Sequence, residues 1–327
     1  MRIHIQNTAN FNRAYDVDEA LWAAALTRNG EDGAAYQVTF GKTPGDYASN
    51  IVDAEFLLSH NRSIPDLFPV EAPKLKFVMC GNAGLDSLAP FDWLPPGVTL
   101  LTNSGTHADK AGEYAIMALL MLANRVPAFV TAQREARWDR QAGRLLRDGR
   151  LTVVGLGALG GAAAHHGKTF GMHVTGVRTS ASPHPACDRV VATGDIDRVL
   201  PETDYLVLAC PLTPATRNIL DRRRLALLPA HAGLVNIGRG ALVDEPALCD
   251  ALDAGALAGA VLDVFAEEPL PPDARIWTTP NVVITPHMSA DDPTRYMANT
   301  LDVLFENMKA LREGRPLPNT FDITRGY

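Results

Sequence analysis

Three side chains suited to acid–base and anion-binding chemistry each follow an apolar run in the second half of the chain: Arg239, Glu268 and His287. A guanidinium binds a carboxylate through two parallel hydrogen bonds, and an imidazole transfers protons near neutral pH. A carboxylate paired with the imidazole would orient it for this transfer. Taken singly, the three residues also fit ordinary structural roles, as an ion-pair partner, a solvated loop charge and a core histidine. Their shared position after apolar runs favours a common site.

The apolar runs in this half have the length and composition of buried strands. Helical segments separate them, and Asp221 and Asp244 stand where helix N-caps are expected. This alternation predicts a doubly wound parallel sheet, which binds ligands at the carboxyl ends of its strands. The expected strands are residues 151–154, 173–177, 205–210, 234–237, 260–264 and 282–285.

A glycine-rich turn, LTVVGLGALG, occupies residues 151–160. Gly155, Gly157 and Gly160 have the G-x-G-x-x-G spacing, which joins a strand to a helix and lets backbone N–H groups approach a pyrophosphate. The match alone is weak, because glycines in a helix rich in Ala and Gly also serve close packing. A helix expected at 162–170, before the strand at 173–177, completes a βαβ unit and favours a dinucleotide site.

The residue that ends the second strand of this unit distinguishes the two nicotinamide dinucleotides. A carboxylate there accepts hydrogen bonds from the adenosine ribose of NAD. This chain has Arg178, Thr179 and Ser180, a cation and two hydroxyls that suit the 2′-phosphate of NADP. Alternatively, Arg178 stacks on the adenine and accommodates either cofactor. We expect NADP, with NAD possible.

The first hundred residues predict a small α/β domain of parallel strands. After its fourth strand, residues 81–86 form a glycine-rich loop that could present bare N–H groups to an anion or could be an ordinary turn. The expected elements are strands at 2–6, 36–40, 54–59, 75–80 and 98–101 and a helix at 18–28.

A helix is expected at 108–124, and the polar, Arg-rich segment 133–150 follows it. We interpret this segment as a connection between domains. Trp138 within it would be either a packing residue at a hinge or an anchor in a dimer interface. Because the segment is long for an intramolecular linker, we expect a homodimer.

Composition limits the class of protein. Hydrophobic residues make up 46% and charged residues 20% of the 327 residues, and the net charge of −7 argues against a nucleic-acid partner. The N-terminus lacks the layout of a secretory signal, and no apolar run reaches the length of a membrane span. The four cysteines lack the paired spacing of metal ligands. We expect a cytoplasmic protein without metal or membrane contact.

The motifs LTVVGLGALG, ACPLTPAT, LVNIGRGALVDEPAL, AVLDVFAEEPLP and NVVITPHMSA occur in this order. The set resembles the successive signatures of the D-isomer-specific 2-hydroxyacid dehydrogenases, and in particular NADP-type glyoxylate/hydroxypyruvate reductases. GNAGLD, NSGTHADKAGEYA and the C-terminal FDITRGY extend the resemblance over nearly the whole chain. It implies a Rossmann domain at 103–290 inserted in a smaller, flavodoxin-like substrate domain at 1–102 and 291–327, with the last helix packed on that smaller domain.

By the same resemblance, Arg239 binds and polarises a 2-oxo acid, His287 donates the proton and Glu268 is the charge partner of His287. The implied reaction is NADPH-dependent reduction to the D-2-hydroxy acid. The expected substrate contacts are Asn82, Ala83, Gly84, Arg239 and His287. The expected cofactor contacts are Gly155, Gly157, Ala158, Leu159, Gly160, Arg178, Thr179, Ser180, Cys210, Pro211, Thr216, Ile237, Gly238 and, at the nicotinamide carboxamide, Asp263.

Two features depart from the family pattern. Many relatives have Asp where this chain has Arg178, which moves the expectation from NADH to NADPH. Many also have Val-Ala where this chain has Ala111-Gly112, for which the sequence offers no functional reason.

Three other functions share this scaffold. Formate dehydrogenases resemble one another in having Gln where Glu268 stands, which disfavours that activity. Phosphite dehydrogenases share the Arg, Glu and His positions, so these three residues do not exclude them. The C-terminal-binding-protein corepressors use the scaffold as a cofactor-sensing interaction module, which a test of turnover distinguishes from an enzyme.

Overall fold

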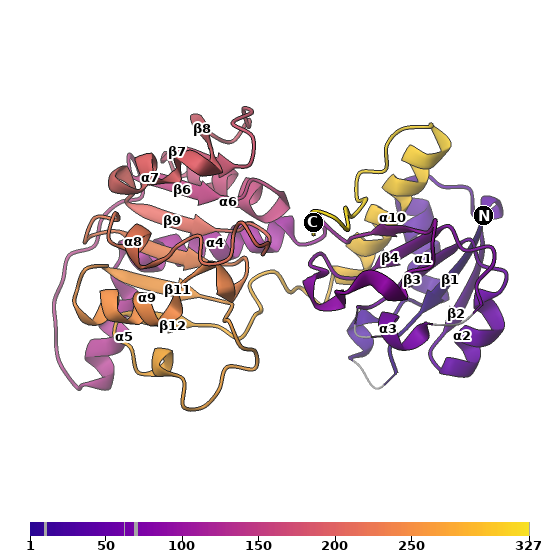
Figure 1. Ribbon diagram of the computed structural model, residues 1–327, viewed down its shortest axis with the longest axis horizontal. Coiled ribbons are helices and arrows are strands. Elements are labelled where there is room, and N and C mark those ends of the chain that lie inside the picture. The colour runs from indigo at the N-terminus through magenta and orange to yellow at the C-terminus, as the bar shows by residue number, and fades with distance from the viewer. Residues whose placement is uncertain (10–11, 62, 69–70, 327) are drawn as a thin grey trace. The chain divides into compact units, whose positions relative to one another are not determined.

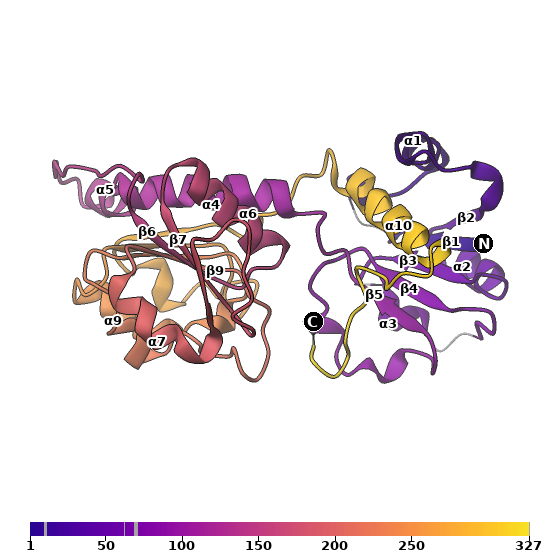
Figure 2. The same cartoon turned by 90° about the horizontal axis from the view of Figure 1, so that it is seen from above.

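The chain divides into two compact units in the computed structural model, which describes residues 1–9, 12–61, 63–68 and 71–326. One unit comprises Met1–Thr106 and Asp292–Tyr327, and the other comprises His107–Asp291. Each unit is a parallel sheet with helices on both faces (Figures 1 and 2). The predicted α/β fold class is therefore confirmed. Tyr327, the last residue of the FDITRGY motif, lies outside the described residues.

The first unit contains a five-stranded sheet in the order β2-β1-β3-β4-β5. Its helices α1 and α10 cover one face, where the rings of Trp22 and Phe305 lie 5.1 Å apart between centroids, and α2 and α3 cover the other. The strands are β1 (Arg2–Gln6), β2 (Gln37–Gly41), β3 (Phe56–Ser59), β4 (Phe77–Cys80) and β5 (Thr99–Leu101). The helices are α1 (Glu19–Asn29), α2 (Pro44–Ile51), α3 (Ile64–Leu67) and α10 (Tyr296–Arg312).

The second unit contains a seven-stranded sheet in the order β12-β11-β10-β9-β6-β7-β8. The strand order reverses between β6 and β9, so the glycine-rich turn after β6 lies at the topological switch point where ligands of such sheets bind. The strands are β6 (Arg150–Val154), β7 (His173–Arg178), β8 (Arg189–Ala192), β9 (Tyr205–Leu208), β10 (Gly233–Asn236), β11 (Gly259–Leu262) and β12 (Val282–Ile284). The helices are α4 (Ala108–Ala123), α5 (Val126–Arg134), α6 (Ala158–Thr169), α7 (Ile196–Val199), α8 (Arg222–Leu225) and α9 (Glu245–Asp253).

Two hydrophobic cores lie on opposite faces of this second sheet. Helices α4 and α6 contribute to one core, and α7, α8 and α9 contribute to the other (Figure 2). Neighbouring strand residues divide between them: Val153 packs in the first and Val154 in the second. A strand with both faces buried is expected to be apolar throughout, as β6 is from Leu151 to Val154 apart from Thr152.

The structure corrects several expectations in this unit. Helix α6 begins at Ala158 rather than at 162, so its first turn belongs to the glycine motif. Strand β8 and helix α5 were not predicted. The segment 133–150, interpreted as a connection between domains, lies wholly within the second unit, so that interpretation is wrong. Its residues 135–149 join α5 to β6.

The Ala111-Gly112 departure has a packing explanation. A Cβ atom at Gly112 on α4 would lie 2.6 Å from the ring of His166 and 3.1 Å from Cβ of Ala162, both on α6. Real Cβ atoms do not approach other atoms to 2.6 Å, so a side chain at this position would have to displace the histidine ring. The glycine therefore allows α4 and α6 to pack closely.

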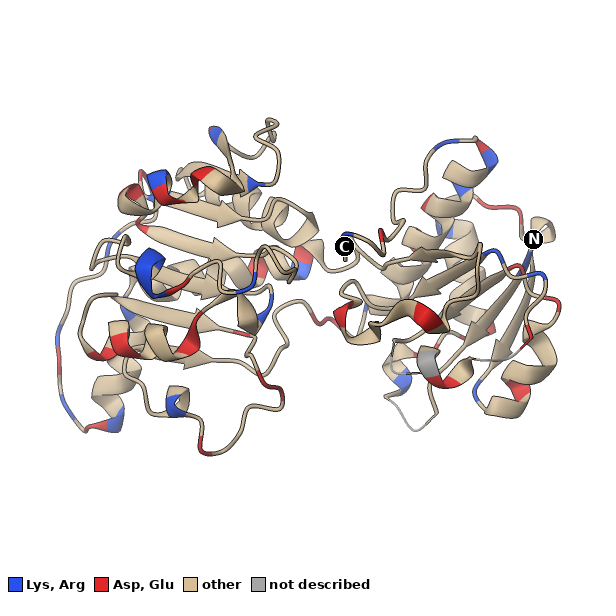
Figure 3. Cartoon of the chain, in the orientation of Figure 1, with Lys and Arg blue, Asp and Glu red and all other residues tan. Residues whose placement is uncertain are grey.

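Charged residues of both signs are interspersed over both units (Figure 3). Within the described ranges, no single helix has both the length and the hydropathy of a membrane span. Helices α4 and α5 have the required length and hydropathy only when they are taken together, and a bend of 64° separates them.

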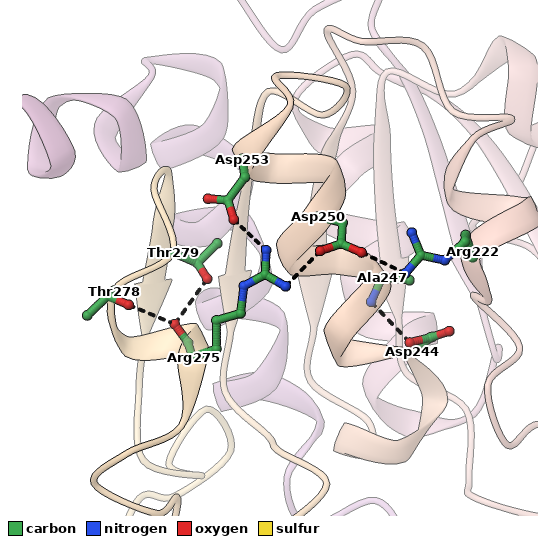
Figure 4. A network of polar contacts seen from close by, with 8 residues as sticks. All are labelled: Arg222, Asp244, Ala247, Asp250, Asp253, Arg275, Thr278 and Thr279. Atoms are coloured by element: carbon green, nitrogen blue, oxygen red, sulfur yellow. Dashed lines mark hydrogen bonds and ion pairs between the residues drawn. The ribbon is translucent and has the colours of Figure 1, made fainter.

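The N-cap of α9 gives a stability prediction. Asp244 accepts a hydrogen bond from the N–H of Ala247 at 3.1 Å (Figure 4). Asp244→Ala should lower the free energy of unfolding by about 1 kcal/mol, because it leaves a first-turn N–H group without its acceptor. Urea denaturation followed by circular dichroism measures this. Asp244→Asn keeps a capping oxygen and should stay near wild type; equal stability of the Ala and Asn variants would contradict the assignment.

Candidate active site

Three loops that follow neighbouring parallel strands meet at one edge of the second sheet. Strands β10, β11 and β12 are paired in this order, so their carboxyl ends lie side by side. Arg239 follows β10, Glu268 follows β11 and His287 follows β12. The structure thus brings together the three residues that the sequence singled out.

Glu268 and His287 form a hydrogen-bonded pair. Glu268 Oε2 lies 2.6 Å from His287 Nδ1, and Glu268 Oε1 accepts the N–H of Phe265 at 2.9 Å. The carboxylate is thus fixed by its own loop and orients the ring. Because Nδ1 is engaged, Nε2 is the ring nitrogen left for a substrate.

The loop that carries His287 is held by Asp263, the residue after β11. His287 has a φ of +51°, a left-handed conformation that is costly for a residue with a side chain. Its N–H donates to the backbone oxygen of Asp263 at 2.8 Å. The Asp263 carboxylate accepts the N–H of Met288 on Oδ1 and the N–H of Ser289 on Oδ2, both at 2.9 Å. Asp263 has no exposed surface, and the expected contact of Asp263 with the nicotinamide carboxamide stays a prediction.

The Arg239 loop packs directly on the Glu268 loop through Gly240. A Cβ atom at Gly240 would lie 1.8 Å from the carbonyl carbon of Phe265, where no side chain can fit. Asn236, the last residue of β10, accepts the N–H of Gly238 at 3.1 Å and donates to the backbone oxygen of Arg239 at 3.0 Å. Gly240 thus serves the close approach of the two loops.

The glycine-rich turn after β6 has the geometry of a phosphate cradle. Gly155 has a φ of +89°, and a Cβ at Gly160 would lie 1.8 Å from the Gly155 oxygen, so both positions require glycine. A Cβ at Gly157, by contrast, would meet nothing within 4 Å, so open space faces the start of α6. The first-turn N–H groups of α6, including those of Ala158 and Leu159, have no acceptor within the helix. Such a helix start suits an anion.

Arg178 is the last residue of β7 and is half-buried at the carboxyl edge of the same sheet. Its guanidinium makes no hydrogen bond or ion pair with the residues that the structure describes. Thr179 and Ser180 follow it and are exposed, and Ser180 Oγ lies 3.0 Å from Ser182 Oγ. A cation and two hydroxyls are thus gathered beside the glycine-rich turn.

The remaining residues that were expected to contact the cofactor follow β9 and β10. Cys210 packs against the turn, since a Cβ at Gly155 would lie 2.5 Å from its Cα atom. Burial raises the pKa of the Cys210 thiol to about 12, so it remains protonated at neutral pH. Thr216 Oγ1 donates to the backbone oxygen of Pro211 at 2.7 Å and accepts the N–H of Thr213 at 2.7 Å, so it fixes its own loop. Ile237 is buried and Gly238 packs against the Cys210 oxygen.

The glycine-rich loop of the first unit is anchored on its own sheet. Asn82 Oδ1 accepts the N–H of Asn61 at 3.1 Å, and the Asn82 backbone oxygen accepts the N–H of Asn103 at 3.0 Å. The N–H groups of Ala83 and Gly84 donate to no acceptor within the described part of the chain. The loop can therefore present these two donors to an anion.

An ion-pair network fixes the far end of the long loop that carries Glu268. Arg275 pairs with Asp250 at 2.7 Å and with Asp253 at 2.5 Å, both on α9, and Asp250 also pairs with Arg222 at 2.7 Å (Figure 4). All of these side chains are substantially exposed, so each pair contributes little stability. These ion pairs attach the part of the loop that precedes β12 to helix α9 of the same unit.

Sequence reasoning missed three polar residues that hydrogen-bond to the loops of the site or to one another. Asn236 holds the Arg239 loop, Thr285 Oγ1 donates to Asp263 Oδ1 at 2.6 Å, and the Tyr114 hydroxyl lies 2.6 Å from Thr285 Oγ1. For Asn236 and Thr285, a polar residue in an apolar run was the signal that could have identified them. Among the described residues, no group of three His, Cys, Asp or Glu side chains could hold a metal ion.

The contact between the two loops gives a second stability prediction. Gly240→Ala should lower the free energy of unfolding by about 3 kcal/mol or more, because its methyl group would overlap backbone atoms that cannot move aside as a side chain can. Thermal and urea denaturation measure this. Gly194→Ala is the matched control, since a Cβ there meets nothing within 4 Å. Equal stability of the two variants would show that the loops are not in contact at Gly240.

The chain is similar to dehydrogenases and reductases of one family. The family profile described as D-isomer specific 2-hydroxyacid dehydrogenase, NAD binding domain, matches residues 116–289. The glyoxylate reductase of Korarchaeum cryptofilum is 31% identical over 255 residues, which cover 76% of each chain. The D-3-phosphoglycerate dehydrogenase of Methanocaldococcus jannaschii is 30% identical over 286 residues, which cover 86% of this chain and 54% of that relative. This chain thus spans about half the length of that relative.

A solved structure extends the similarity to the whole chain. The NADPH-dependent glyoxylate/hydroxypyruvate reductase of Sinorhizobium meliloti, solved with NADP and sulfate, is 28% identical, with a TM-score of 0.80 and coverage of 100% of both chains. Together with the matched profile, this similarity leads to one conclusion: the chain belongs to the D-isomer specific 2-hydroxyacid dehydrogenase family.

Proposed function

We propose that this protein reduces a small 2-oxo acid, of the glyoxylate or hydroxypyruvate kind, to the D-2-hydroxy acid with NADPH. The observation that carries the proposal is the Glu268–His287 pair, 2.6 Å between Oε2 and Nδ1, at the sheet edge that also holds Arg239 and the glycine-rich turn. The names of the relatives, a glyoxylate reductase and an NADPH-dependent glyoxylate/hydroxypyruvate reductase, support the same reaction.

In this mechanism the side chains bind the oxo acid and deliver a proton. Arg239 binds the oxo acid and draws electron density from its carbonyl. When bound, the reduced nicotinamide supplies the hydride that adds to the carbonyl carbon. His287 gives the proton on Nε2 to the carbonyl oxygen as negative charge develops there, and Glu268 stabilises the charged imidazolium before that transfer.

The residues present fit the dinucleotide. The open space at Gly157 and the first-turn N–H groups of α6 would hold the pyrophosphate. Arg178, Thr179 and Ser180 would hold the 2′-phosphate, for which the absence of a carboxylate at the end of β7 leaves no repulsion. We therefore assign cofactor binding to the unit formed by residues 107–291.

The first unit would supply the substrate carboxylate site. The N–H groups of Ala83 and Gly84 are suitable donors, and Asn82 holds their loop in place through Asn61. We assign this role to the unit formed by residues 1–106 and 292–327.

A substrate panel tests the proposed function. Wild-type protein should reduce at least one of glyoxylate, hydroxypyruvate and phenylpyruvate with NADPH, measured as the loss of nicotinamide absorbance. Negligible turnover on all three would refute the enzyme and favour the cofactor-sensing scaffold.

Replacing the proton donor should remove activity. His287→Asn should lower kcat by about 10² to 10⁴, the usual contribution of general acid–base catalysis, while NADPH still binds. The matched control is His231→Asn: His231 Nε2 lies 2.7 Å from Asp204 Oδ1, but His231 precedes β10 and Asp204 precedes β9, so this pair lies at the amino end of the strands. The control should keep wild-type turnover; near-normal kcat in His287→Asn would remove His287 from the mechanism.

Reversing the charge at residue 178 should exchange the cofactors. A charge-assisted contact contributes about 1.5 to 3 kcal/mol, so NADPH should be preferred over NADH by roughly ten- to a hundredfold in kcat/KM. Arg178→Asp should favour NADH, because a carboxylate accepts the 2′-hydroxyl and repels the phosphate. Arg189→Asp, at the start of β8, is the control and should leave the ratio unchanged. Equal use of both cofactors by wild type would mean that Arg178 only packs beside the adenine.

We also propose a homodimer formed through the segment 135–149. Its side chains Trp138 and Leu145 are 97% and 80% exposed, a large apolar area for one segment without helix or strand. A second copy would bury them. Light scattering at micromolar concentration should give twice the monomer mass, and Trp138→Ser combined with Leu145→Ser should shift the protein towards monomer. A wild-type monomer would refute the proposal.

A further inference from the structure

A buried chain of hydroxyl groups leads from α4 to the residue that holds the His287 loop. Tyr114, on α4, is 2% exposed, and its hydroxyl lies 2.6 Å from Thr285 Oγ1. Thr285 Oγ1 donates in turn to Asp263 Oδ1 at 2.6 Å. Thr285 has one hydroxyl hydrogen and gives it to Asp263, so Tyr114 must be the donor to Thr285.

This direction agrees with the protonation of the phenol. Burial raises the pKa of Tyr114 to about 12; the hydrogen bond with Thr285 lowers this pKa, and the nearby Asp263 charge raises it by a smaller amount. Tyr114 therefore keeps its proton and remains a donor over the neutral range. The chain of donors ends at the one group in it that only accepts, the Asp263 carboxylate.

The two carboxylate oxygens of Asp263 accept hydrogen bonds from different donors. Oδ1 accepts two donors, the Thr285 hydroxyl and the N–H of Met288, and Oδ2 accepts the N–H of Ser289. The N–H of His287 itself goes to the backbone oxygen of Asp263. Rotation of the carboxylate would therefore break contacts to both residues that follow His287.

We propose that Tyr114 is a positioning residue for the reduction: through Thr285 it fixes the Asp263 carboxylate, which keeps the loop 285–289 in the conformation that places His287 beside Glu268. The inference rests on the proposed function for its effect on turnover. Tyr114 touches no reacting group. Its hydroxyl contacts Thr285, which is 171 positions away in the sequence and directly follows β12. A small displacement of a catalytic group suffices for a large effect, since about 1 Å can cost a factor of about 10² in rate.

The experiment compares four variants of the full chain. Tyr114→Phe removes the first donor, and Thr285→Val removes the middle hydroxyl while keeping the shape of the side chain. Thr285→Ser keeps that hydroxyl and loses only a methyl group. Tyr47→Phe is the matched control, because the Tyr47 hydroxyl is also buried but has no hydrogen-bond partner among the described residues.

Two readouts are needed, one of them independent of turnover. The first is kcat and KM for hydroxypyruvate with NADPH. The second is amide hydrogen exchange of residues 287–289 in the protein without ligands, which reports opening of this loop.

Tyr114→Phe and Thr285→Val should each lower kcat by about tenfold, with KM for the oxo acid changed less than about threefold, because the proton donor and not the binding site is displaced. In both variants, exchange at 287–289 should be faster than in wild type. Thr285→Ser and Tyr47→Phe should stay near wild type in both readouts.

Two results would overturn the inference. The first is that Tyr114→Phe and Thr285→Val both keep the exchange rates and the kcat of wild type. The second is that Thr285→Ser and Thr285→Val lose equal fractions of kcat, since the methyl group rather than the hydroxyl would then be important. The exchange measurement needs no substrate. It therefore tests the inference even where wild type reduces no oxo acid, the result that would refute the proposed function instead.

Discussion

The buried carboxylate of Asp263 is the interaction on which the site depends. A carboxylate without exposed surface is costly unless its oxygens are fully engaged, and here three donors reach it from the segment 285–289. The loop and the carboxylate stabilise each other. The donors of the loop offset the cost of burying the charge, and the carboxylate holds the loop in a conformation with a left-handed backbone at His287, which would otherwise be unfavourable.

The other two loops at this edge are held by backbone contacts. Gly240 brings the Arg239 loop against Phe265, and Phe265 donates its N–H to Glu268. The position of the glutamate is therefore linked to that of the arginine loop through a single residue. Such an arrangement places the candidate catalytic side chains on a rigid support and limits their movement before a ligand binds.

The sequence was sufficient for the parallel sheets, for the glycine-rich turn and for the placement of Arg239, Glu268 and His287 at one sheet edge, because each depends on local spacing or on an apolar run. It was not sufficient for contacts between distant segments. Tyr114 and Thr285 are 171 positions apart, and only the packing of α4 on the sheet brings them together. Gly112 likewise has no explanation in the sequence, because it is the packing of α6 on α4 that places His166 against it. The short α5 and β8 were missed because their stability comes mainly from tertiary packing rather than from local pattern.

The central claim is that one sheet edge holds both the cofactor and the proton donor. A crystal structure of the protein with NADP and oxamate, an unreactive analogue of a 2-oxo acid, tests it most directly. The account predicts the pyrophosphate at the start of α6, and oxamate with its carbonyl oxygen in hydrogen-bond contact with His287 Nε2 and Arg239. A cofactor bound away from the glycine-rich turn, or oxamate out of reach of His287, would contradict it.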